Sequence, residues 1–247
     1  MPETPDPTAA APIARRPLRS DEVHDRLRRD ILSGELQPGE AVPSERALSD
    51  RLGVNRHAVR EAIKRLQQAG LVVVSQGGAT RVLDWQTYGG LDLLGDVAPL
   101  LEGAARFRTL RSVAEMRASI GTDAARLCAR EGAADLRAGL PAVIDDMAAA
   151  EDYEEQLRIY EVLWMRIVMG SGNLAYRLAF NSLVAARHGA GVSGEVYASE
   201  VTDVDAARAI ADAIAGGDEQ RAAAAARQML DRTIATAESL RVQFEEP

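Results

Sequence analysis

The sequence predicts a mainly α-helical protein in two parts, a small N-terminal module that ends in a hairpin and a larger all-helical C-terminal half. Apolar residues recur at helical spacing along most of the 247 residues. From residue 106 onward, no alternation typical of strands appears. The parts also differ in charge, because residues 43–82 carry seven basic and three acidic side chains within a protein of formal net charge −8. A local positive patch is therefore expected in the first part.

The composition is that of an ordinary globular protein, with 47% hydrophobic and 27% charged residues. The single cysteine, Cys128, excludes an internal disulfide framework. No apolar run approaches the roughly 18 residues of a membrane helix, and the N-terminus lacks the basic start of a signal peptide. We therefore expect a cytoplasmic protein with no membrane partner. Residues 1–17 hold five of the ten prolines and are expected to form a disordered tail.

Catalytic motifs are missing from the sequence. Lys64 is the sole lysine and follows Ile63, which excludes a Walker A phosphate loop. The three histidines, His24, His57 and His188, are too scattered to suggest a metal cluster, and no G-x-S-x-G or H-E-x-x-H motif occurs. We therefore expect a protein that is not an enzyme.

The first two helices are predicted from apolar spacing and from capping residues. Residues 21–33 form an amphipathic helix, because apolar side chains recur at every fourth position from Val23 to Ile31. A second, shorter helix begins at Ser44, a good cap, and ends at Gly53, where a left-handed residue can terminate it.

A third helix follows directly and leads into a hairpin. It begins at Asn55, and its apolar stripe from Val59 to Leu66 follows the spacing i, i+3, i+4, i+7. Residues 71–74 and 80–82 flank a glycine-containing turn and predict two paired strands. Helix, helix, short turn, helix and hairpin in this order predict a winged helix-turn-helix, in which the third helix enters the major groove of DNA.

The third predicted helix carries a positive face. Arg56, His57, Arg60 and Lys64 lie off its apolar stripe, where a recognition helix presents side chains to bases and phosphates. Residues 1–84 contain no Phe, Tyr or Trp, so the module lacks a platform for stacking bases, which favours double-stranded DNA over single strands or RNA. A protein-interaction module with a merely solvated basic face is the alternative.

Three short runs in this module resemble the DNA-binding domain of GntR-superfamily bacterial regulators. They are Pro43–Leu48 (PSERAL), Leu52–Arg56 (LGVNR) and Val59–Ala62 (VREA). The resemblance implies DNA contacts by seven residues on the second helix, the third helix and the hairpin tip. These are Arg46, Asn55, Arg56, His57, Arg60, Gln76 and Gly77.

The predicted domain organisation has four segments. The disordered tail over 1–17 precedes the winged helix-turn-helix at 18–83, a linker at 84–105 and an all-helical effector-binding and dimerisation domain at 106–243. Within the linker, residues 85–94 (WQTYGGLDLL) are similar to the linker of the fatty-acid-responsive regulators of the FadR type. The similarity implies a connector between an effector signal and the DNA-binding module.

The C-terminal half is predicted to contain only helices, separated by glycines. The predicted helices span 106–131, 134–150, 152–169, 173–188, 203–216 and 218–241. Arg117, the turn Ser171-Gly172-Asn173 and Gly217-Asp218 resemble the FCD effector domain that the FadR subfamily shares.

The same resemblance bears on metal binding. Many regulators with this domain hold a divalent metal with an Asp and a His at the positions that are Tyr160 and Trp164 here, together with two later histidines. We therefore expect no metal and no other cofactor. Two aromatic side chains at this spacing make an apolar wall suited to an acyl chain. The alternative is that they are plain core residues, since helical spacing alone favours burial.

Arg117 is the first candidate for anchoring an acidic effector, because a buried arginine on an apolar helix needs an anionic partner. Asn173 is a weaker candidate that could simply cap its helix. With the two aromatic residues, the full set of predicted effector contacts is Arg117, Tyr160, Trp164, Asn173, Tyr176 and Arg227.

These observations lead to one principal hypothesis. The chain is expected to be a homodimeric transcriptional regulator that binds a palindromic operator on double-stranded DNA and responds to an acyl-CoA or a related acidic lipid metabolite. A repressor answering to a small carboxylate or sugar acid without a metal is the alternative. Two other classes are disfavoured. An enzyme fused to a winged helix would need a catalytic constellation, and the sequence has none. A constitutive structural DNA-binding protein would leave most of the chain without a function.

Overall fold

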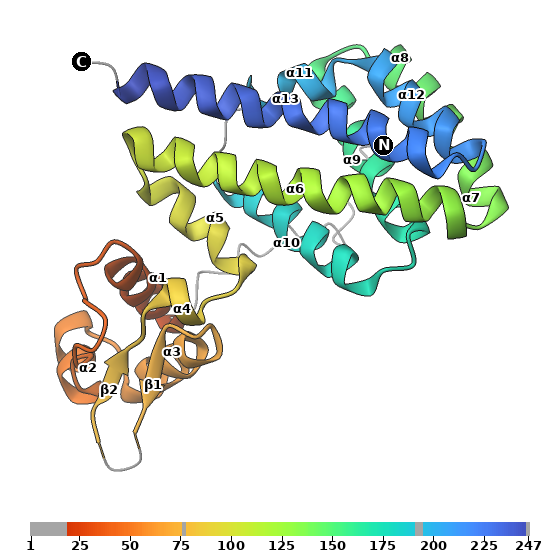
Figure 1. The fold of residues 1–247 in the computed structure, drawn as a ribbon. Helices are drawn as coiled ribbons and strands as arrows, with labels where there is room; N and C mark the ends of the chain where they lie inside the picture. The colour runs from red at the N-terminus through yellow and green to blue at the C-terminus, as the bar shows by residue number, and fades with distance from the viewer. Residues whose placement is uncertain (1–18, 76–77, 191–194, 246–247) are drawn as a thin grey trace, which may run out of the picture. The chain divides into compact units, whose positions relative to one another are not determined.

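The computed structural model describes residues 19–75, 78–190 and 195–245. The chain forms two compact units, Met1–Gly90 and Leu91–Pro247, which we call the N-terminal unit and the helical unit. Helices dominate both (Figure 1). The predicted mainly α fold class is confirmed.

The N-terminal unit contains four helices and one hairpin in its described residues. Its elements are α1 (Arg19–Leu32), α2 (Glu45–Leu52), α3 (Arg56–Gln68), β1 (Val72–Val74), β2 (Thr80–Val82) and α4 (Trp85–Tyr88). Their order is that of a winged helix-turn-helix, as the sequence predicts (Figure 1).

Local capping fixes the turn between α2 and α3. The Ser44 hydroxyl accepts the N–H of Ala47 at the start of α2, and the Asn55 side chain accepts the N–H of Ala58 at 2.8 Å at the start of α3. Gly53 ends α2 with φ of 62°, a left-handed conformation that favours glycine. The three caps set the direction in which α3 leaves the turn.

The apolar faces of α1 and α3 pack against each other and form the core of the N-terminal unit. Leu27 on α1 and Val59 and Leu66 on α3 are fully buried, and Leu48 on α2 is buried with them. The opposite face of α3 is left to solvent. The packing of its apolar side therefore decides which α3 residues are exposed.

The hairpin pairs β1 and β2 in antiparallel register, with Val72 opposite Val82. An isolated antiparallel β-bridge also joins Ala41 to Arg81 of β2. Residues 76–77, at the turn, lie outside the described residues.

The helical unit begins within the predicted linker. Its elements are η1 (Leu91–Leu93), α5 (Leu94–Val97), η2 (Ala98–Leu100), α6 (Gly103–Glu131), α7 (Ala134–Ala138), α8 (Leu140–Ala149), α9 (Tyr153–Gly170), α10 (Leu174–Ala190), α11 (Glu195–Val201), α12 (Val204–Ala215) and α13 (Glu219–Glu245).

Three features of this unit differ from the sequence prediction. Residues 91–100 are short helices packed on α10, with Leu93 and Val97 buried, rather than a simple connector. The predicted helix 134–150 is divided between α7 and α8, because Pro141 lacks an N–H and fits the first turn of a new helix. Helix α11 was not predicted.

Helices α6 and α13, the longest of those described, lie side by side (Figure 1). Small side chains allow this contact, since Ala118 on α6 and Ala222 and Ala226 on α13 are fully buried. A Cβ added to Gly121 would lie 2.6 Å from Leu230 Cδ1 and 3.0 Å from the Trp164 ring. The approach of α6 to α13 and α9 therefore depends on the missing side chain at this position.

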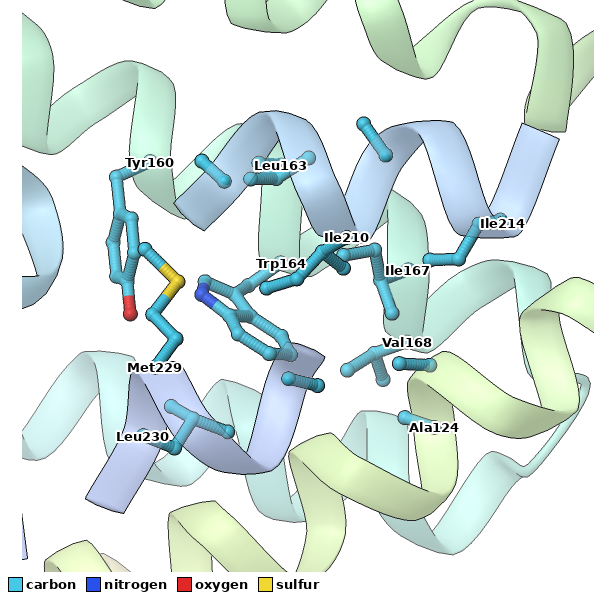
Figure 2. Close-up of a cluster of buried hydrophobic side chains, with 14 of the residues drawn as sticks. Ala124, Tyr160, Leu163, Trp164, Ile167, Val168, Ile210, Ile214, Met229 and Leu230 are labelled. Carbon is cyan, nitrogen blue, oxygen red and sulfur yellow. The ribbon is translucent and has the colours of Figure 1, made fainter. Parts of the chain in front are cut away.

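The core of the helical unit brings α9, α12 and α13 together (Figure 2). Leu163 and Ile167 on α9, Ile210 on α12 and Met229 on α13 belong to one cluster of buried side chains, and all four are fully buried. Cys128 on α6 is also buried, and burial raises the pKa of its thiol to about 11, so the thiol stays protonated near neutral pH. Among the described helices, none combines the length and the apolar character that crossing a membrane requires.

Candidate functional site

The exposed face of α3 carries most of the predicted DNA contacts. Asn55, Arg56, His57 and Arg60 are exposed along it, and the exposed Arg46 lies on α2. The Asn55 carboxamide oxygen is engaged in capping. Gln76 and Gly77, the predicted contacts at the hairpin tip, lie outside the described residues.

An ion pair joins α2 and α3 on this surface. The Arg60 guanidinium donates through Nε and Nη2 to the two Glu45 carboxylate oxygens, at 3.1 and 2.8 Å. The hydrogen bond from Arg60 holds the pKa of Glu45 below its usual value. Arg46 lies 3.8 Å from Asp50, and both side chains are largely exposed. Arg60 is therefore already held by a carboxylate, whereas Arg46 is only loosely associated with one.

A cavity of about 80 Å³ lies among α6, α9, α10, α11 and α13 in the helical unit. Three predicted effector contacts, Arg117, Tyr160 and Trp164, line it together. Its other wall residues, mostly apolar, are Val113, Ile120, Gly121, Leu157, Glu161, Val168, Phe180, Leu183, Val184, Arg187, Tyr197 and Leu230. Tyr160 and Trp164 are only 4% and 5% exposed, so they are core residues and cavity wall at once.

Arg117 has an anionic partner within the protein. Its Nη2 donates to Glu200 Oε2 on α11 at 2.9 Å, and the Glu200 side chain is fully buried. The Tyr160 hydroxyl donates to the same oxygen at 2.5 Å. The Arg117 guanidinium also lies over the Tyr197 ring, 4.7 Å from its centroid. These four side chains form a cluster that we call the Arg117–Glu200 cluster.

Charge within this cluster fixes its protonation state. Burial alone would lower the pKa of Arg117, but the Glu200 charge outweighs it and raises the pKa above its usual value. Burial and the same carboxylate raise the pKa of Tyr160 well above its usual value. The arginine is therefore cationic and the phenol a neutral donor at physiological pH.

A second ion pair lines the cavity. Arg187 on α10 donates through Nε to Glu161 Oε1 on α9 at 3.0 Å, and both side chains are about one-fifth exposed. The cavity wall thus contains two cations, each held by a carboxylate of the same unit.

The remaining predicted effector contacts lie outside this cavity, so the structure does not bring the six together. Asn173 caps α10, its Oδ1 accepting the N–H of Ala175 at 3.0 Å. The Tyr176 hydroxyl donates to Asp123 at 3.0 Å. Arg227 pairs with Asp231 one turn along α13, on an exposed face. Each of these three side chains therefore already has a hydrogen-bond or ion-pair partner within the protein.

Comparison with known proteins decides the family. The model for bacterial regulatory proteins of the gntR family matches residues 19–82, and the FCD domain model matches residues 112–232. The HTH-type transcriptional regulator Mce2R of Mycobacterium tuberculosis is 36% identical over 234 residues, which cover 90% of this chain and 92% of the relative. The chain belongs to the GntR family. Its members regulate transcription and are not enzymes, which confirms that prediction.

Other relatives of this GntR-family regulator agree. An uncharacterised HTH-type transcriptional regulator of Mycobacterium bovis matches with the same identity and coverage. The solved structure of Lar, which controls the expression of the Listeria monocytogenes agr system, has a TM-score of 0.58 at 17% identity, over 91% of this chain and 99% of that chain. At this identity the likeness shows the fold alone.

Sequence reasoning missed Tyr197 and the Glu161–Arg187 pair in this GntR-family regulator, and above all Glu200, the partner of Arg117. Glu200 lies on α11, which follows a glycine-rich stretch that suggested a loop. Val196 and Val201 flank it and are buried. An acidic residue between apolar residues that can share one helix face was the available signal.

Metal ligands are not gathered in the part of the chain that the structure describes, where no three His, Cys, Asp or Glu residues are placed to hold one ion. Tyr160 and Trp164, the positions at which the resemblance implies metal ligands in other regulators, meet edge to face with ring centroids 6.3 Å apart.

The ion pair between Glu45 and Arg60 yields a test on the DNA-binding surface. Glu45→Gln removes a negative charge and releases Arg60 from its carboxylate. Operator affinity should therefore rise, and the dependence of log K on log salt should steepen by about one. Fluorescence anisotropy over a salt series measures both quantities. Asp50→Asn removes a charge whose partner, Arg46, is only loosely held, so it should change both quantities less than Glu45→Gln does. Weaker binding at unchanged slope would show instead that Glu45 positions Arg60 for a specific contact.

Proposed function

We propose that this GntR-family protein is a homodimeric, ligand-responsive regulator. Its N-terminal unit binds a palindromic operator on double-stranded DNA, and its helical unit takes up a small effector in the cavity. The observation that carries the proposal is the meeting of Arg117, Tyr160 and Trp164, from two helices, in one largely apolar cavity where Arg117 is paired with the buried Glu200. Such a cavity is the usual form of a small-molecule site.

The effector that best suits the wall carries an acyl chain. The Trp164 indole, Leu230 and Phe180 offer apolar surface, and burying a methylene there contributes about 0.8 kcal/mol. An acyl-CoA-type effector, and with it a role in lipid metabolism, is therefore the first candidate. The resemblance of residues 85–94 to the FadR-type linker supports the same choice.

A small carboxylate or sugar acid is the second candidate from the sequence. It would need an anion site, but Arg117 and Arg187 already have carboxylate partners, Glu200 and Glu161. A small polar molecule would also leave the apolar wall unused. Both features favour the acyl chain.

Dimerisation follows from the way helix-turn-helix proteins read DNA. Two recognition helices related by a two-fold axis match two half-sites one helical turn apart. The effector alters binding only if it prefers one arrangement of these helices over another. A protein that works on operator DNA acts in the cytoplasm of a bacterial cell.

Titrating effectors against an operator complex tests this function. An operator is first selected in vitro from random duplexes with the full-length protein. Acyl-CoAs of short, medium and long chain, and small dicarboxylates and sugar acids, are then added to the complex. Affinity should change with the acyl-CoAs and depend on chain length. An unchanged affinity at every chain length would discard the lipid effector, and a response only to small acids would establish the second candidate.

The side chains on α9 also bear on metal content. Because Tyr160 and Trp164 stand where relatives carry ligands, we expect no stoichiometric zinc or manganese in the purified protein. Elemental analysis by plasma mass spectrometry of protein prepared without chelator measures it. One bound metal per chain would show that the metal-ligand positions were assigned to the wrong residues.

A further inference from the structure

We propose that the group which the effector places beside Arg117 is an uncharged hydroxyl or carbonyl, and that Glu200 excludes free carboxylates from this position. The inference rests on the proposed function, in that the effector binds in the cavity of the helical unit. It names the chemical class of the buried end of the effector: an alcohol, amide, ester or thioester on an apolar chain.

The charge balance of the cavity is the first argument. Arg117 faces Glu200 at 2.9 Å, and Arg187 faces Glu161 at 3.0 Å. The wall contains no further charged side chain among the described residues that line it. An entering anion would lose its hydration without gaining an unpaired cation, and it would meet the Glu200 charge at short range. An uncharged group meets neither cost.

The hydrogen-bonding capacity of the Arg117–Glu200 pair is the second argument. Glu200 Oε2 accepts from both Arg117 Nη2 and the Tyr160 hydroxyl, whereas Oε1 is buried with no partner in the described chain. Arg117 Nη1 is likewise buried without an acceptor there. The ion pair therefore leaves one donor and one acceptor without a hydrogen bond, which is unfavourable for buried polar groups. Of the two residues, Arg117 is the one that lines the cavity.

A hydroxyl or a primary amide can accept from Nη1 without bringing a charge into the cavity. An ester or thioester carbonyl satisfies the donor. A carboxylate beside Arg117 would bring a second negative charge close to Glu200, whose charge already balances that of Arg117. The pair thus discriminates between an acid and its uncharged derivatives on the same chain. A thioester keeps an acyl-CoA among the candidates, and a free fatty acid is excluded.

Three soluble probes with the same chain test this selectivity. Octanol, octanamide and octanoate are titrated by isothermal calorimetry into the wild-type, full-length protein at neutral pH, where octanoate is ionised. Octanol and octanamide should bind at least about tenfold more tightly than octanoate, because only octanoate carries a charge.

A variant assigns the selectivity to Glu200. In Glu200→Gln the like charge is gone and Arg117 lacks its carboxylate, so octanoate should bind about tenfold more tightly than to the wild type while octanol changes little. Glu238→Gln is the matched control, since Glu238 pairs with Arg111 and Arg241 outside the cavity, and it should change no affinity. Circular dichroism checks that both variants are folded, and the wild-type comparison stands without them.

The outcomes separate this inference from the proposed function. Octanoate binding as tightly as octanol to the wild type would overturn the inference and leave a lipid-binding cavity in place. Unchanged octanoate affinity in a folded Glu200→Gln variant would overturn the role of Glu200. Binding of none of the three probes would overturn both the lipid site and the selectivity that rests on it.

Discussion

Replacing Glu200 by alanine is expected to lower the free energy of unfolding of the protein by about 3–5 kcal/mol. The substitution leaves the Arg117 charge among apolar side chains without its carboxylate. It also removes the acceptor of the Tyr160 hydroxyl, which is buried with it. Urea denaturation followed by far-ultraviolet circular dichroism measures the change, and Trp164 fluorescence in a Trp85→Phe background reports on the helical unit.

A matched pair of variants separates the buried charge from general damage. The double variant Arg117→Met, Glu200→Leu removes both charges and should recover most of the lost stability, because uncharged side chains of similar volume replace the buried ion pair. Glu238→Ala, which breaks a solvent-accessible ion pair on α13, should have a much smaller effect. A loss of less than about 1 kcal/mol in Glu200→Ala would contradict the account of a buried ion pair.

Replacing Arg56 by alanine is expected to weaken operator binding by about 1–3 kcal/mol for each half-site. Arg56 is the first residue of α3, exposed beside the Asn55 cap, so its side chain is available to bases or phosphates. Its loss touches no core residue and should leave the helix content unchanged. Fluorescence anisotropy with the selected operator measures the affinity, and circular dichroism measures the helix content.

The matched control uses another arginine of α3. Arg65 lies near the end of the helix and pairs with Asp21 on α1 at 2.5 Å, so Arg65→Ala should leave operator affinity nearly unchanged. Wild-type affinity in Arg56→Ala would refute the assignment of this face of α3 to DNA. Equal losses in both variants would indicate a diffuse electrostatic contact rather than a recognition helix.

The N-terminal unit is the part that the sequence predicts best, because its signals are local. Ser44, Gly53 and Asn55 end or begin helices in the structure as predicted, and each cap acts within three or four residues of chain. Apolar spacing from Val59 to Leu66 selects the buried side of α3, and so also its exposed side. Local chemistry was therefore sufficient to identify the candidate DNA-binding face.

Helix α11 could not be predicted from local signals in the sequence. It has seven residues, too few for a clear apolar period, and isolated helices of this length are unstable in water. Packing supplies its stability, because Val196 and Val201 are buried and α11 contacts α13. A segment that is helical only through its tertiary contacts leaves no pattern in the sequence that distinguishes it from a loop.

The cavity of the helical unit was predicted only in part, for the same reason. Tyr160 and Trp164, one helical turn apart on α9, line the cavity together, and Arg117 does have the anionic partner that its burial requires. That partner, Glu200, lies 83 residues away along the chain. Only the packing of α11 against α9 and α13 brings the carboxylate to the guanidinium, and this packing is not encoded in helical spacing. The prediction assigned to a ligand the role that Glu200 fills.

The alanine-lined contact between α6 and α13 limits how the helical unit can respond mechanically. Helix α6 has 29 residues and is therefore roughly 43 Å long, and Arg117 lies near its midpoint. Ala118 is fully buried and Gly121 lies close to side chains of α9 and α13, so this part of α6 is packed too closely to bend by itself. An effector that moves the Arg117 side chain is therefore expected to shift α6 together with α13, and so to move both ends of α6.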